Sequence, residues 1–170
     1  MTARRCRHAL IAALMALVLG GCALFSNVAD VAPGTPQAAV LATYGQPTAR
    51  YPATATEGAR WQYSLEPSGQ AVYNVDFDAA GRVVHAEQAL NEGLFGQRIK
   101  VGHWTRADVL REYGPPARTM EVHNFNGIIW VYRYTNGPTW RLLYIDIDPA
   151  GIVQSYSEGD QNLPDLMDSR

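Results

Sequence analysis

Apolar and polar residues alternate along two stretches of the chain, and this pattern predicts strands. Residues 61–65 (WQYSL) and 73–77 (YNVDF) place large apolar side chains at every second position, which is the period of a half-buried strand. The turn sequence DAAG follows at residues 78–81, where Gly81 can take a left-handed conformation. A third strand is therefore expected after this turn.

Two helices are marked by their ends. Thr35, which precedes a proline, is a favourable N-cap, and Gly45 is a typical stop. Thr105 and Asp108 have the spacing of a capping box, and Gly114 followed by two prolines ends the second helix. The apolar side chains at helical spacing are Ala39, Val40, Tyr44, Val109, Leu110 and Tyr113.

The chain contains an internal repeat. Residues 40–47 (VLATYGQP) match residues 109–116 (VLREYGPP), 69 positions later. Two further blocks follow in the same order, residues 61–63 with 130–132 at a spacing of 69, and residues 75–83 (VDFDAAGRV) with 145–153 (IDIDPAGIV) at a spacing of 70. Three blocks in one order predict two copies of the same structural unit.

The repeat gives the domain organisation. The predicted fold class is α+β, with two tandem modules that each contain one or two helices followed by a three-stranded antiparallel sheet. Residues 90–101 predict a first helix of the second module, and residues 23–31 are its shortened counterpart. The expected segments are a signal peptide at 1–21, a tether at 22–33, a first module at 34–89, a second module at 90–159 and a polar tail at 160–170.

The N-terminal segment has the composition of a secretory signal. Three arginines and a histidine precede the apolar residues 9–19, a run of eleven, whereas about 20 are needed to span a bilayer. Two glycines then precede Cys22. This ending resembles the lipobox of bacterial lipoproteins, in which Leu stands three positions before a cysteine that becomes the acylated first residue. The resemblance implies an acyl chain such as palmitate on Cys22, and Ala23 after it implies release to the outer membrane.

Removal of the signal changes both the cysteine count and the charge. Cys6 leaves with the signal and Cys22 carries the lipid, so no thiol remains for a disulfide, a metal site or a nucleophile. The mature chain has 11 Lys and Arg against 16 Asp and Glu, a formal charge of −5. An acidic chain without a basic cluster argues against a nucleic-acid partner. No cofactor is expected besides the covalent lipid.

Two groups of possible metal ligands have simpler explanations. Asp76, Asp78 and Glu87 partly follow the spacing of a calcium loop, but such a loop needs about six oxygen ligands, so a hairpin turn is expected instead. The histidines His85, His103 and His123 lack the short regular spacing of zinc ligands and are expected on the surface or in turns. No catalytic motif is present, and the chain is not expected to be an enzyme.

The combination of elements resembles a known family. Two short helices, a Gly-Pro stop, a Trp-x-Tyr strand and a Phe-Asp-x-x-Gly-x-Val hairpin are similar to the small BamE (SmpA/OmlA) lipoproteins of the outer-membrane β-barrel assembly machinery. The match runs from Phe95 to Val153 in the second module and from Gly34 onward in the first. The tandem arrangement is similar to β-lactamase inhibitory proteins, whose paired modules form one concave sheet that binds another protein.

The second module carries the candidate binding surface. If Trp130 and Tyr132 face the helices, the opposite strand face is apolar and aromatic, which is typical of a protein-binding surface when exposed. The expected partner-binding residues are Val131, Arg133, Trp140, Leu142 and Tyr144. The alternative is that the first module or a second copy covers this face. The corresponding face of the first module is mostly polar, with Gln62, Ser64, Val72, Asn74 and Asp76.

The sequence therefore predicts a non-enzymatic lipoprotein on the periplasmic face of a bacterial outer membrane. It is expected to contact the membrane through its lipid, to bind a periplasmic or outer-membrane protein, and to support outer-membrane protein assembly or envelope integrity. The β-barrel assembly machinery is one candidate partner. The alternative function is a periplasmic inhibitor or binding module of the β-lactamase inhibitory protein type.

Overall fold

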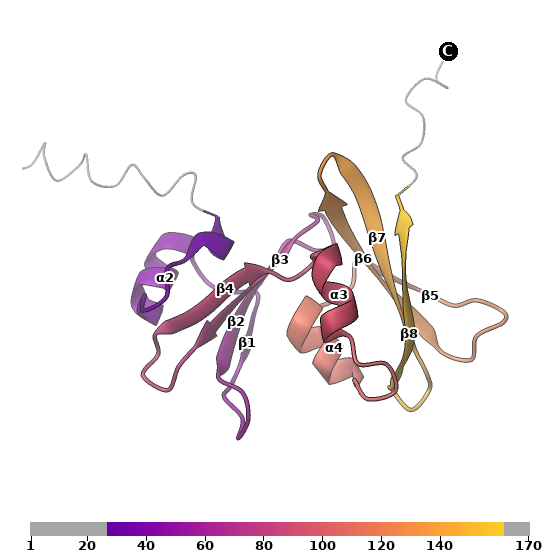
Figure 1. Ribbon diagram of the computed structural model, residues 1–170, viewed down its shortest axis with the longest axis horizontal. Helices are drawn as coiled ribbons and strands as arrows, with labels where there is room; N and C mark the ends of the chain where they lie inside the picture. Colours follow the sequence, from indigo (N-terminus) through magenta and orange to yellow (C-terminus); the bar gives the residue numbers. More distant parts are fainter. Residues whose placement is uncertain (1–26, 162–170) are drawn as a thin grey trace, which may run out of the picture.

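A computed structural model describes residues 27–161 as two modules in tandem (Figure 1). The expected signal peptide, the acylation site Cys22 and residues 162–170 lie outside the described residues. The first module contains η2 (Val28–Asp30), α2 (Gln37–Tyr44), β1 (Ala49–Tyr51), β2 (Ala59–Ser64), β3 (Val72–Phe77) and β4 (Val83–Gln88). The second contains α3 (Glu92–Arg98), α4 (Arg106–Tyr113), β5 (Arg118–Met120), β6 (Ile128–Asn136), β7 (Thr139–Ile147) and β8 (Val153–Asp160).

The α+β class and the tandem arrangement are confirmed, but each sheet has four antiparallel strands instead of the three predicted. The strand orders are β1-β2-β3-β4 and β5-β6-β7-β8. The additional strands, β1 and β5, are three residues long and too short to show an alternating pattern. Each begins four residues after the glycine that ends a helix, where the sequence suggests only a loop.

The helix ends agree with the sequence in most respects. The capping box of Thr105 and Asp108 is present, and α3 lies within the predicted residues 90–101. The predicted N-cap at Thr35 is wrong, because α2 begins one residue later, at Gln37, with Pro36 as its N-cap. The Thr35 carbonyl instead accepts the Val83 amide, so this residue continues the edge of the first sheet.

The segment boundaries also differ slightly from the sequence pattern. The second half of the expected tether is folded, because η2 lies there and Val31 is buried in the core of the first module. At the other end β8 continues to Asp160, one residue into the expected tail. The first module therefore begins before residue 34.

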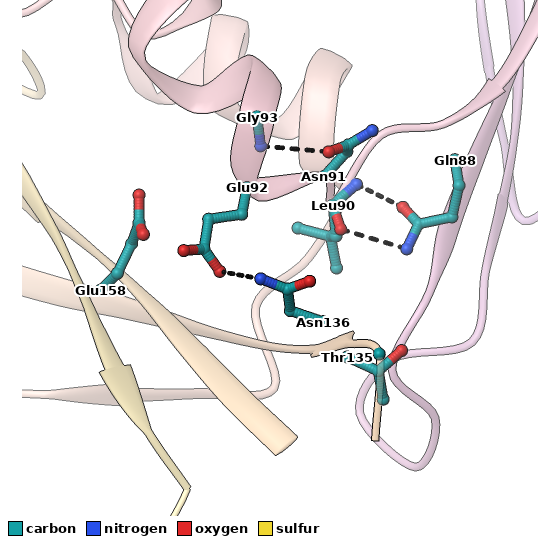
Figure 2. A pocket seen from close by; sticks show the side chains of 9 residues that line it. Gln88, Leu90, Asn91, Glu92, Gly93, Thr135, Asn136 and Glu158 are labelled. Atoms are coloured by element: carbon teal, nitrogen blue, oxygen red, sulfur yellow. Dashed lines mark hydrogen bonds between the residues drawn. The ribbon is translucent and has the colours of Figure 1, made fainter. Parts of the chain in front are cut away.

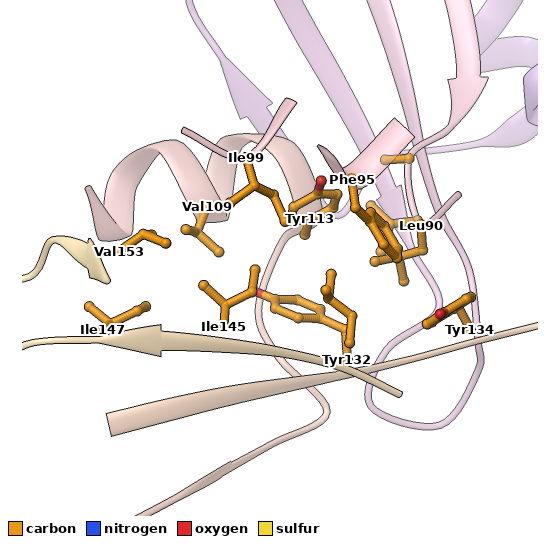
Figure 3. Packing of buried hydrophobic residues seen from close by; sticks show 13 residues of the cluster. Leu90, Phe95, Ile99, Val109, Tyr113, Tyr132, Tyr134, Ile145, Ile147 and Val153 are labelled. Carbon is orange, nitrogen blue, oxygen red and sulfur yellow. The ribbon is translucent and has the colours of Figure 1, made fainter. Parts of the chain in front are cut away.

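The elements stack in four layers: η2 and α2, the first sheet, α3 and α4, and the second sheet (Figure 1). Trp61, Val75 and Phe77 face α2 and η2 in the smaller core. In the larger core, Val109 and Tyr113 of α4 point toward Tyr132, Ile145 and Ile147 of the second sheet (Figure 3). Since α3 and α4 lie between the two sheets, the modules do not form the single concave sheet that the likeness to β-lactamase inhibitory proteins implies.

The polar face of the first sheet is buried against the second module. Gln62 and Asn74 are fully buried. The Gln62 amide donates to the carbonyls of Leu110 (3.3 Å) and Arg111 (3.2 Å), and the Asn74 amide donates to the carbonyl of Glu112 (2.8 Å). Carbonyls in the last turn of a helix lack helical partners. The two amides therefore cap the C-terminal end of α4 from the neighbouring module.

Ion pairs reinforce this junction. Glu112 of α4 is only 8% exposed and contacts both Arg60 (2.5 Å) and Arg98 (2.6 Å). Arg60 also binds Asp76, and Arg98 also binds Glu87, each at 2.6 Å. Burial opposes ionisation of Glu87, but the hydrogen bonds and positive charges of Arg98 and His85 together outweigh it and hold the pKa of Glu87 below its ordinary value. The two modules thus share one connected network of charges.

Candidate functional site

The strand face that points away from α3 and α4 is the candidate site, and it is called here the outer face of the second sheet. The predicted alternation is confirmed: Trp130 and Tyr132 pack against the helices, whereas Ile129, Val131 and Leu142 form a separate cluster on the outer face. The pairing of β6 with β7 places Val131 opposite Tyr144. The expected binding residues therefore share one face.

One half of the outer face is covered by the chain itself. The loop of residues 121–127, between β5 and β6, packs Val122 and Phe125 against the cluster of Ile129, Val131 and Leu142. Val131 has no exposed surface and Leu142 is 8% exposed. Val131 therefore lies beneath the chain's own cover, and Leu142 exposes only a small part of its side chain, toward the neighbouring groove.

The other half of the outer face forms an open groove of about 340 Å³. Its lining residues are Arg118, Arg133, Leu142, Tyr144, Asp160 and Gln161. Tyr144 extends across β8, where a side chain in place of Gly159 would come within 3.3 Å of the ring. Trp140 lies two positions from Leu142 on the same strand face and is 41% exposed. Four of the five expected residues, all except Val131, thus line or adjoin the groove.

Arg133 is held in place by the first module. Its backbone amide donates to the Glu66 carboxylate (2.7 Å), and its guanidinium donates to the carbonyls of Gly69 (3.0 Å) and Pro67. Burial raises the pKa of Glu66, although the Arg133 amide and guanidinium partly oppose the shift. Sequence reasoning missed this contact, because Glu66 lies in a turn 67 residues away with no motif around it.

The charge of the groove is positive. Asp160 is already paired with Arg141, and Arg133 is within 3.7 Å of Glu66. Arg118 has no carboxylate partner among the described residues and only approaches the sulfur of Met120 (3.6 Å). An exposed tryptophan, a tyrosine and a free guanidinium therefore gather in one concave patch of an otherwise acidic chain.

A larger cavity, about 670 Å³, lies elsewhere and is lined mostly by polar residues. Its side chains bind one another: Glu92 accepts from Asn136 (3.1 Å), and the Gln88 amide binds both backbone groups of Leu90 (Figure 2). Across residues 27–161 no three His, Cys, Asp or Glu side chains are close enough to hold a metal ion.

The other candidate ligands have structural roles or are exposed. Asp78 accepts the amides of Ala80 and Arg82 (2.9 Å each), and Asp148 accepts the amide of Ile152 (2.9 Å), so both carboxylates close hairpin turns as predicted. The side chain of His85 is 57% exposed. Within the described part of the chain no helix is long and apolar enough to cross a membrane.

Comparison with known proteins assigns the chain to no family. No protein-family model matches the chain, and no curated protein matches it. Among solved structures, the chain is similar to a DUF4309 family protein, YjgB, from Bacillus subtilis subsp. subtilis strain 168, with 17% identity over 74% of this chain and 78% of that chain. The TM-score of 0.31 is too low for this likeness to carry an argument.

Proposed function

We propose that this chain is an outer-membrane lipoprotein facing the periplasm, and that it binds a protein partner through Trp140 and the adjacent groove. The observation that carries the proposal is the patch itself, in which Trp140, Tyr144 and Arg118 remain accessible. Tryptophan, tyrosine and arginine are the residues that most often dominate binding energy at protein interfaces. The role of this protein in envelope assembly or integrity is then to bind a partner rather than to catalyse a reaction.

The lipobox supports the location. Cys22 ends a signal-like segment, and η2 begins at Val28. The five intervening residues span at most about 18 Å. An acyl group on Cys22 would therefore keep the first module close to the membrane surface.

Cys22→Ser should abolish incorporation of a fatty-acid probe and release the chain into the soluble periplasmic fraction. The reason is that no other cysteine remains after removal of residues 1–21. Metabolic labelling followed by membrane fractionation measures both effects. Cys6→Ser is the matched control and should label like the parent, because Cys6 leaves with the signal peptide. Unchanged labelling of Cys22→Ser would rule out the anchor.

The partner can be sought with a photoreactive amino acid at position 140. Position 84 is the matched control, because Val84 is 52% exposed but lies on β4 of the first module. We expect a discrete crosslinked product in intact cells from position 140 alone. Equal products from both positions would contradict binding at the groove. Capture of assembly machinery favours the envelope role, whereas capture of a secreted enzyme favours the alternative inhibitor role.

Trp140→Ala should weaken binding of the captured partner by about 2 kcal/mol, or roughly 30-fold, because an aromatic anchor is lost. Its melting temperature should stay near that of the parent, since Trp140 is partly exposed and belongs to neither core. Leu65→Ala is the control, because Leu65 is 53% exposed on the first module. Titration calorimetry and thermal melts measure the two effects. Parent-like affinity of Trp140→Ala would refute this anchor.

A further inference from the structure

The internal repeat allows the outer faces of the two sheets to be compared position by position. Gln62 pairs with Asn74 on the first sheet, and the equivalent pair on the second is Val131 with Tyr144. Ile129 likewise occupies the place of Arg60. The two faces therefore have the same geometry, but polar residues on the first are replaced by apolar and aromatic residues on the second.

The two faces are covered by different segments. The first receives the C-terminal end of α4, through hydrogen bonds to the carbonyls of Leu110, Arg111 and Glu112. The second is covered in part by its own loop, residues 121–127. This loop thus occupies, on the second sheet, the position that a helix end occupies on the first.

The equivalent loop of the first module has the same length but does not cover its sheet. Residues 52–58 carry Ala53 and Thr56 at the positions of Val122 and Phe125. That loop is bound to α4 instead, because Arg111 pairs with Glu57 (2.7 Å) and donates to the carbonyl of Gly58 (2.9 Å). Two side chains, Val122 and Phe125, therefore distinguish the face that its own loop covers from the face that α4 covers.

The covering loop is weakly attached. Among residues 27–161, its only hydrogen bond beyond the strand ladders is its own turn, from the Phe125 amide to the Val122 carbonyl (3.2 Å). A hollow of about 380 Å³, lined by Arg106, Val122, Phe125 and Pro149 among others, adjoins it. The loop is therefore held mainly by the apolar contacts of its two large side chains.

A complementary helix end is present on this same chain. α2 is the repeat counterpart of α4, and its Leu41, Ala42 and Thr43 correspond to Leu110, Arg111 and Glu112. α2 contains no charged residue, and Ala42 and Thr43 are exposed. The charged helix end thus meets a polar sheet face within the chain, whereas the uncharged helix end and the apolar sheet face lie at opposite ends of the described residues (Figure 1).

We propose that the outer face of the second sheet is a docking site for the C-terminal end of α2 of a second copy of this chain, and that loop 121–127 occupies this site in the single chain. The contact would be head to tail, so displacement of the loop would produce open chains of copies rather than closed dimers. The side chains of Arg118 and Tyr144 border the site and offer donors to the helix carbonyls. This inference concerns the covered half of the face and does not depend on the partner proposed above.

The test is to give the second loop the residues of the first. A soluble form without residues 1–22 that carries Val122→Ala and Phe125→Thr should associate, with a mass in sedimentation equilibrium that rises with concentration to two or more chains. The parent should remain a single chain. Adding Ala42→Glu should restore the single chain, because Ala42 holds the place of Arg111, whose side chain lies in the equivalent junction, and a carboxylate there would lose water in an apolar contact.

Three results would overturn the proposal. One is a double variant that is folded, as judged by circular dichroism, but stays monomeric at every concentration at which the parent is monomeric. Another is association that persists with Ala42→Glu, because it would show non-specific aggregation. A third is association of the parent that Ala42→Glu leaves unchanged. If the double variant does not fold, Phe125→Thr alone, which keeps Val122, is judged by the same measurement and the same Ala42→Glu control.

Discussion

Replacing Glu112 with alanine should lower the free energy of unfolding by about 1.5–3 kcal/mol, because Arg60 and Arg98 each lose a charge-assisted hydrogen bond, although each keeps a second carboxylate, Asp76 and Glu87. Glu112 is 8% exposed and is the only carboxylate that both Arg60 and Arg98 contact among the described residues. Urea unfolding of the soluble form measures the change. Both modules should unfold less cooperatively, since this side chain joins them.

Glu57→Ala is the matched control for this prediction. Glu57 also forms an ion pair across the junction, with Arg111 at 2.7 Å, but its side chain is 56% exposed. An exposed pair contributes about 1 kcal/mol or less. Equal losses for the two variants would contradict the view that burial, rather than pairing alone, makes Glu112 important.

Gly114→Val should destabilise the protein more than Gly45→Val, although the two glycines end equivalent helices. Both have a positive φ, 75° at Gly45 and 71° at Gly114, with ψ near 180°, a region essentially restricted to glycine. A side chain at 45 meets nothing within 4 Å, so backbone strain of about 1–3 kcal/mol is the expected loss. A side chain at 114 would lie 2.8 Å from the Gln62 amide oxygen.

The extra loss of stability in Gly114→Val, relative to Gly45→Val, measures the contribution of the Gln62 contacts at the junction between the modules. If Gln62 is pushed away, its buried amide loses its bonds to α4, which should cost about 1–3 kcal/mol more. Thermal and urea unfolding of the two variants give the difference. Equal destabilisation would mean that Gln62 moves without cost, and that the amide cap on α4 contributes little to stability.

The repeat, the helices and the longer strands could be predicted from the sequence because local patterns determine them. Alternation placed Trp61 and Tyr132 on the correct faces, and the caps located α4. The strands β1 and β5 could not be predicted in the same way. Three residues are too few to show a period, and these strands exist because β2 and β6 offer an edge beside them.

The burial of the first sheet's polar face was not predictable from local patterns. Gln62 and Asn74 alternate with apolar residues, as they would on a strand face exposed to water. Their partners are backbone carbonyls of α4, 38 to 49 residues away. Every residue has such a carbonyl, so the sequence does not show which ones accept these bonds. Side-chain amides that bond carbonyls are equally suited to water, so composition alone does not distinguish the two environments.

The candidate site shows the same limit. Trp140, Leu142 and Tyr144 were predicted together because a strand places every second residue on one face. The cover over Val131 was not, because Val122 and Phe125 lie in a loop without any period. In the sequence, this cover is indicated only by the repeat, in which the equivalent positions are occupied by the smaller residues Ala53 and Thr56.

The polar junction has a consequence for the order in which the chain folds. Under the proposed location the chain enters the periplasm N-terminus first, so the first module arrives before α4, and N-terminal units generally fold first. The first sheet is then exposed on one face until α4 packs against it. Because that face presents Arg60, Gln62, Asn74 and Asp76, with Val72 as its main apolar residue, water can satisfy it in the interval. The partly folded chain is thereby protected from aggregation until the second module folds.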